Sequence, residues 1–147
     1  MKVTICSKNI LNNADDFRTI ALIINKEIKE NRKCYPVQFF VNSIFAIELY
    51  LKTIYLANNK KYIKDIHNLE ELFNIIPQKD RKSLNSLQSN IKNILEEYSN
   101  SYIKWRYSYE QSGFISGNDE KIIQTLNTLH NYCNKEYKKT IYEFYNG

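Results

Sequence analysis

The segment WRYSYE, residues 105–110, contains the most promising binding residue in the sequence. Arg106 lies there between Trp105 and Tyr107, and Tyr109 is three residues after Arg106. A guanidinium group offers a fork of N–H donors that matches a phosphate, and aromatic neighbours can stack on a base or orient that fork. Aromatic clusters are also common in protein cores. The segment therefore indicates either a nucleic-acid contact or a packed helix end.

A second set of candidate residues interrupts the longest apolar stretch of the chain, residues 36–58. These residues are Asn42, Glu48 and Lys52. A charged residue in a buried helix persists only if it is paired or faces a cleft. Glu48 precedes Lys52 by four residues, which is the favourable order for an ion pair along a helix. We expect the two to pair, either as part of a polar cleft or as a buried ion pair that fixes the register of the helix.

The two histidines, His67 and His130, are isolated in the sequence. His130 lies beside Leu129 in the last apolar segment, and we expect a structural role because a lone histidine on a helix lacks orienting partners. His67 opens a short apolar segment directly after a lysine-rich connection. It can cap or pack against that segment, or it can face a cleft as a general acid or base.

Other chemistry has little support in the sequence. It contains no glycine-rich phosphate loop, no Cys or His ligand pair and no nucleophile elbow, so we expect neither a metal nor a cofactor. The three cysteines, Cys6, Cys34 and Cys133, are widely spaced and odd in number, which favours a reducing compartment. The N-terminal residues resemble neither a signal peptide nor a membrane anchor, so we expect a cytoplasmic protein. A net charge of +5 favours an anionic partner, although a solvated basic surface would give the same value.

With three glycines and two prolines in 147 residues, the composition predicts an all-α protein with few tight turns. We expect one domain, residues 1–147, folded as an up-and-down bundle of four long helices and one short helix. Apolar periodicity places four of the helices at about residues 13–30, 36–58, 67–77 (the short one) and 79–107. The last helix follows residue 118 and carries apolar residues as far as Phe144.

Several details of these helices follow from residue types. Asn13 is a candidate N-cap for the first helix, with Asp15 and Asp16 near its positive end. The stretch 36–58 is apolar on most sides, which is typical of a central helix surrounded by others. Residues 79–107 carry a bundle seam that includes Leu87, and Asn118 is a candidate cap after a glycine-containing loop.

Three segments carry a family resemblance: FAIELYLKTIYL at 45–56, HNLEELFNIIP at 67–77 and WRYSYE at 105–110. Together they resemble the HEPN superfamily of small helical bundles, over about residues 36–112. The resemblance implies an RNA-associated protein of a bacterial defence or toxin–antitoxin system. That superfamily includes metal-independent RNA endonucleases and non-catalytic members that bind nucleotides or partner proteins. Active members usually pair two protomers, whose shared cleft holds an arginine followed by a histidine four to six residues later.

Arg106 matches the arginine of this pattern, but the three positions where the histidine would fall hold Gln111, Ser112 and Gly113. RNA cleavage through the 2′-hydroxyl needs a proton acceptor and a proton donor, and glutamine and serine are poor substitutes for imidazole. The resemblance therefore implies RNA binding more strongly than cleavage.

By the same resemblance, Glu48 is expected to orient Arg106, and Lys52, Asn42, Tyr107 and Tyr109 are expected to contribute to RNA or nucleotide binding. The expected partners are RNA, a second copy of the chain, and a cognate antitoxin or the product of a neighbouring gene. Two alternatives remain open. One is a catalytically inactive structural or regulatory partner, and the other is a metal-independent endoribonuclease that uses Arg106 with His67.

Overall fold

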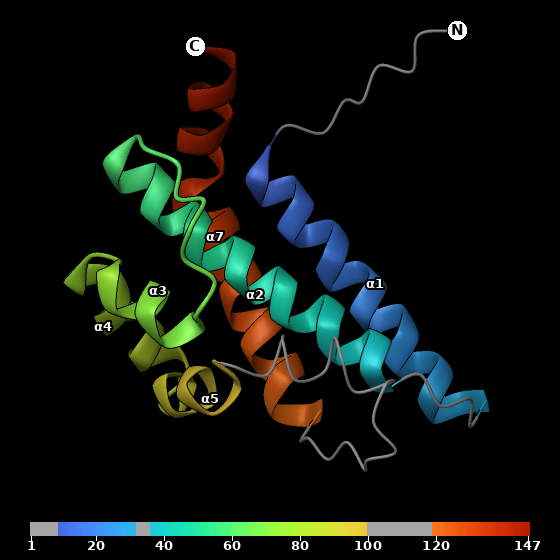
Figure 1. The fold of residues 1–147 in the computed structure, drawn as a ribbon. Coiled ribbons are helices and arrows are strands. Elements are labelled where there is room, and N and C mark those ends of the chain that lie inside the picture. The colour runs from blue at the N-terminus through green and yellow to red at the C-terminus, as the bar shows by residue number, and fades with distance from the viewer. Residues whose placement is uncertain (1–8, 32–35, 100–118) are drawn as a thin grey trace, which may run out of the picture.

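The computed structural model describes residues 9–31, 36–99 and 119–147, and all regular secondary structure in these ranges is helical. The helices are α1 (Ile10–Asn31), α2 (Pro36–Asn59), α3 (Leu69–Ile75), α4 (Gln78–Leu87), α5 (Ile91–Tyr98) and α7 (Asp119–Asn146) (Figure 1). The predicted all-α class is confirmed.

Helix α2 is the central element, as its apolar sequence predicts. It runs antiparallel to α1 and also packs against α3 and α7 (Figure 1). Within α2, the segment Val37–Asn59 is long and apolar enough to span a membrane by length and composition, but 78% of its most apolar window is buried inside the protein. Such burial is typical of the core helix of a soluble protein.

Helix α1 begins one turn earlier than predicted, because Asn9 is its N-cap. The Asn9 side chain accepts hydrogen bonds from the backbone N–H groups of Leu11 at 2.9 Å and Asn12 at 3.3 Å. Asn13 lies inside the helix, so its assignment as the cap is wrong. Asp15 consequently sits in the second turn, where it is free to contact other helices.

The predicted continuous helix over 79–107 is wrong, because α4 and α5 are separated at residues 88–90. Gln88 has an extended backbone, and its side-chain amide donates to the hydroxyl of Thr125 on α7 at 2.9 Å. Ser89 and Asn90 are weak helix formers, so the helix has little to gain by continuing through them. The break turns Leu87 outward, where 62% of it is exposed. The remaining seam residues within the described range are buried, namely Leu84, Ile91, Ile94 and Tyr98.

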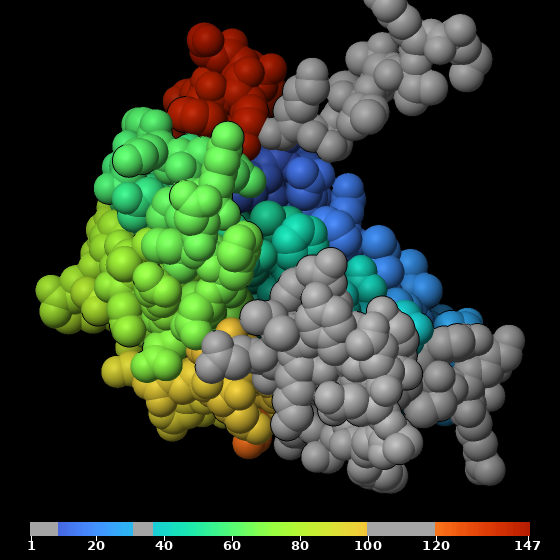
Figure 2. Space-filling view, viewed as in Figure 1, coloured from blue at the N-terminus to red at the C-terminus, as the bar shows by residue number. Residues whose placement is uncertain are grey.

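The predicted short helix is present as α3, and Asn68 rather than His67 caps it. The Asn68 side chain accepts from the backbone N–H of Glu71 at 3.0 Å. Before it, α2 ends at Asn59, and the next residue, Lys60, has a left-handed backbone (φ 54°). The chain then runs back beside α2 to reach α3 (Figure 1). In the space-filling view, α3 and α5 form one continuous surface next to α2 (Figure 2).

Helix α7 begins at Asp119 and packs against both α1 and α2. The proposed cap Asn118 and the predicted loop before it lie outside the described residues.

Candidate functional site

Glu48, Lys52 and His67 form a polar cluster on the side of α2 that faces α3; we call it the Glu48 cluster. The Glu48 carboxylate lies 2.7 Å from Nδ1 of His67 and 3.7 Å from Nζ of Lys52. Glu48 and Lys52 are each only 6% exposed, whereas the side chain of His67 is 67% exposed. The predicted pairing of Glu48 with Lys52 is confirmed.

Two elements position this cluster. Glu48 and Lys52 are four residues apart on the rigid central helix, which places them one above the other on the same side. His67 comes from the segment after α2. Eleven residues, a rise of about 16 Å, separate Glu48 from the end of α2 at Asn59, so this segment must run back over that distance for His67 to reach Glu48. The Asn68 cap then anchors the backbone next to His67.

The geometry fixes the role of each nitrogen of His67. A carboxylate can only accept hydrogen bonds, so the Nδ1–H group donates to Glu48, and Nε2 is the acceptor of the neutral ring. A carboxylate behind an imidazole orients the ring. The cluster therefore presents an oriented imidazole at the surface, while the ammonium group of Lys52 is buried.

Asn42 does not belong to this cluster. Its side-chain amide donates to the backbone carbonyl of Gln38 at 2.6 Å. It precedes Glu48 by six residues on α2, so it lies about 9 Å away along the axis and about 120° around it. Arg106, Tyr107 and Tyr109 lie outside the described residues, so the predicted convergence of Arg106 with Glu48 stays a prediction.

A second polar cluster, which the sequence did not reveal, joins α1, α2 and α7. The Asp15 carboxylate accepts from the hydroxyl of Tyr50 at 2.5 Å and lies 2.7 Å from Nδ1 of His130, and the amide of Asn134 donates to it at 3.3 Å. Burial and the hydrogen bond to Asp15 raise the pKa of Tyr50 well above its ordinary value. His130 thus has the orienting partners that we expected it to lack. Its contacts connect three helices, which agrees with the predicted structural role.

The Asp15 cluster and the Glu48 cluster lie on different sides of α2. Tyr50 follows Glu48 by two residues, a rotation of about 200° around the helix. The central helix therefore carries one polar cluster toward α3 and another toward α1 and α7.

A third cluster surrounds Asp80, which is fully buried on α4. Its carboxylate accepts from the hydroxyls of Tyr132 and Tyr137 on α7 and from the amide of Asn58 on α2. Burial, followed by the hydrogen bond to Asp80, raises the pKa of Tyr137 to about 12 and also raises that of Tyr132. Asp80 precedes the buried Leu84 by one helical turn, and this spacing was the signal that could have identified it as an inward-facing residue.

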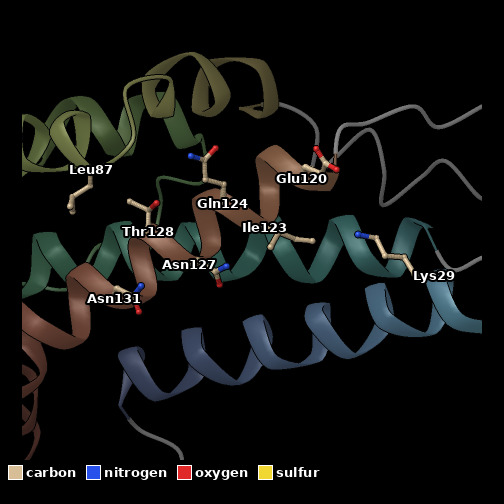
Figure 3. A pocket seen from close by; sticks show the side chains of 8 residues that line it. All are labelled: Lys29, Leu87, Glu120, Ile123, Gln124, Asn127, Thr128 and Asn131. Atoms are coloured by element: carbon tan, nitrogen blue, oxygen red, sulfur yellow. The ribbon is translucent and has the colours of Figure 1, made fainter.

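A surface groove of about 590 Å³ runs along α7 between α1 and α4. Figure 3 shows the side chains of Gln124, Thr128 and Asn131 on α7, with Lys29 extending from α1 and Leu87 from α4. Of the predicted site residues that the structure describes, namely Asn42, Glu48, Lys52 and His67, none lines this groove. Among the described residues, no group of three His, Cys, Asp or Glu side chains could hold a metal ion.

Comparisons with known proteins give one match. No curated protein and no solved structure is significantly similar to this chain. The family model described as the HEPN domain matches residues 21–139, a range that runs from α1 to α7 and includes the Glu48 cluster. It extends the resemblance found in residues 36–112 to most of the helical bundle, and the chain therefore belongs to the HEPN domain family.

Proposed function

We propose that this protein is an RNA-associated HEPN protein of a bacterial defence or toxin–antitoxin system and that RNA binds at the Glu48 cluster. The observation that carries the proposal is the contact between the buried Glu48 and the exposed His67, with Lys52 beside them. A buried ion pair that only fixed the helix register would not need an exposed imidazole as its third member. An oriented imidazole that is exposed at the surface suits contact with a phosphodiester, and the buried ammonium group of Lys52 adds positive charge beside it.

In this proposal, Arg106 supplies the guanidinium that holds a phosphate, and Tyr107 and Tyr109 contact the RNA beside it. Asn42 would meet the RNA further along α2, since it lies away from the Glu48 cluster. The active unit is a single domain, residues 1–147, assembled as a homodimer in the cytoplasm. A cognate antitoxin or neighbouring-gene protein is its proposed regulator.

Binding of a labelled single-stranded RNA of twelve nucleotides, measured by fluorescence anisotropy, tests the proposal. Arg106→Ala and His67→Ala should each weaken binding, since each removes a contact to the RNA. Lys138→Ala is the matched control, because Lys138 is an exposed cation on α7 that belongs neither to the Glu48 cluster nor to the segment 105–110. Equal affinities for all four proteins would reject the proposed site, and the absence of RNA binding by the wild type would leave the structural or regulatory partner as the function.

The contact between His67 and Glu48 also favours a second function, metal-independent cleavage of the bound RNA. In that reaction, Nε2 of His67 takes the proton of a ribose 2′-hydroxyl, and the resulting oxygen attacks the adjacent phosphorus. The bond to the 5′-oxygen then breaks as that oxygen takes a proton from a water molecule, which leaves a 2′,3′-cyclic phosphate, and His67 returns its proton to the solvent. Lys52 and Arg106 would stabilise the negative charge that develops on the phosphate.

Incubation of labelled RNA with the protein in a chelating buffer separates binding from cleavage. Rapid cutting by the wild type that is lost in both His67→Ala and Arg106→Ala would establish the enzyme. General acid–base catalysis typically contributes about 10²- to 10⁴-fold to a rate, so His67→Ala should lower the cleavage rate by that factor. Binding without cutting would leave RNA binding as the function.

A further inference from the structure

A basic pocket of about 210 Å³ lies between α3, α4 and α5, apart from the Glu48 cluster. Its polar lining consists of three cationic and three amide side chains, which are Arg81, Lys82, Lys92, Asn74, Gln78 and Asn85. No acidic residue within the described ranges lines it. The pocket therefore combines positive charge with neutral hydrogen-bond donors, a set that suits a phosphate group.

The register of α4 builds most of this pocket. Gln78, Arg81, Lys82 and Asn85 follow one another at steps of three, one and three residues, so they share one face of the helix. The buried Asp80 points to the other side, where it holds α7. The α4 face with the cations is therefore directed away from the core.

In the described part of the chain, neighbouring side chains leave this charge largely uncompensated. Nε of Arg81 is buried and has no hydrogen-bond acceptor among the residues that the structure describes. Lys92 has a 4.0 Å contact with Glu96 one turn along α5, and both side chains are exposed. Exposed ion pairs of this kind contribute little to stability, so Lys92 can turn to another anion at little cost.

We propose that this pocket binds a phosphate of the RNA backbone and forms a second contact region for RNA. The proposal rests on the proposed function, because it assigns the same RNA an additional site. It involves no residue of the Glu48 cluster and does not involve Arg106, Tyr107 or Tyr109. The two regions can therefore be tested independently.

The test compares two triple variants that remove the same charge. In the pocket variant, Arg81, Lys82 and Lys92 are replaced by glutamine, and in the control variant Lys26, Lys138 and Lys139 are replaced by glutamine. The three control lysines are exposed and do not line the pocket. For each protein, the logarithm of the observed binding constant for the twelve-nucleotide RNA is measured against the logarithm of the salt concentration.

Each phosphate contact with single-stranded nucleic acid contributes about 0.7 to the slope of this plot. The pocket variant should reduce the slope by about 0.7, the value for one phosphate, whereas the control variant should keep the wild-type slope. The single variant Lys82→Gln, at an exposed position that leaves the fold intact, should reduce it by about 0.7 if Lys82 contacts the phosphate. Equal slopes for the pocket and control variants would overturn the inference while the proposed function stands.

Two further outcomes are distinguishable. If the wild type shows no salt-dependent RNA binding, the proposed function fails and the inference fails with it. The second part of the test measures the binding of ATP to the wild type and to the pocket variant. If the pocket variant loses ATP binding but keeps the RNA slope, the pocket binds the phosphates of a free nucleotide, which overturns its assignment to RNA.

Discussion

Glu48 is the residue on which the proposed site depends, because it contacts both Lys52 and His67 from a buried position. Glu48→Ala should lower the free energy of unfolding by about 3 to 5 kcal/mol, since it leaves the buried ammonium of Lys52 without its carboxylate. It should also weaken RNA binding. Glu96→Ala removes an exposed carboxylate with the same four-residue spacing to a lysine, and it should change stability by no more than about 0.5 kcal/mol. Urea denaturation of both variants checks this, and an equal, small loss for both would mean that Glu48 does not compensate a buried charge.

Tyr137 predicts a loss of stability at alkaline pH. Its pKa is raised to about 12 in the folded protein by burial and the Asp80 hydrogen bond, compared with about 10 in an unfolded chain. Between these values the unfolded state releases the phenolic proton and the folded state keeps it, so the free energy of unfolding falls as the pH rises from 10 to 12. Tyr137→Phe should make this fall shallower than in the wild type. Denaturation at pH 9, 10 and 11 measures the difference, and an unchanged pH dependence would contradict this role of Tyr137.

At the residue scale, the sequence predicted pairs within a helix but not contacts between helices. The Glu48 and Lys52 pair followed from a four-residue spacing, because helix geometry alone places them together. His67 reaches Glu48 only because the chain reverses after α2. The Asp15 and His130 contact spans 115 positions and depends on how α1 and α7 pack, which no local pattern encodes.

At the element scale, the turn after α2 determines where His67 lies, and Lys60 makes that turn with a left-handed backbone (φ 54°). This conformation costs a residue with a side chain about 1 to 2 kcal/mol, whereas glycine adopts it freely. Lys60→Gly should therefore raise the free energy of unfolding by about 1 kcal/mol. Lys61→Gly, one residue later at a position without a positive φ, should give no increase. Thermal and urea denaturation of the two variants compare them, and a loss of stability in Lys60→Gly would contradict the expected relief of strain.

Helix positions were predictable where apolar periodicity is strong. They were less predictable where a cap or a break determines the residue at which a helix begins or ends. The prediction for α2 was correct to within one residue, because its apolar stretch is long and starts with Pro36. The seam of residues 79–107 was read as one helix because its apolar spacing continues through the break. Gln88 ends α4 through a hydrogen bond to Thr125, a tertiary contact that the periodicity does not contain.

At the scale of the whole molecule, three polar clusters connect the helices around a continuous apolar core. Two of them, at Asp15 and Asp80, tie α7 to α1, α2 and α4 and account for its place in the bundle. The Glu48 cluster differs from both because it has a mostly exposed side chain, that of His67. This contrast separates a candidate binding site from the structural clusters more clearly than residue type does.

We predict that the molecule is a homodimer at micromolar concentration, in keeping with the paired cleft that the family resemblance implies. Light scattering coupled to size-exclusion chromatography should give twice the chain mass of 17.6 kDa. The mass should be unaffected by Arg106→Ala, which concerns the RNA contact rather than the fold. A monomer at all concentrations tested would require each chain to bind RNA on its own.

The central claim, that RNA binds at the Glu48 cluster, can be tested with the two histidines as internal probes. The chain contains only His67 and His130, so proton NMR shows two imidazole Cε1–H signals, which a His67→Gln variant assigns. On addition of the twelve-nucleotide RNA, the His67 signal should shift or broaden. The His130 signal should stay in place, because Asp15 holds that ring on another side of α2. A His67 signal that is unchanged at saturating RNA, or an effect confined to His130, would contradict the proposed site.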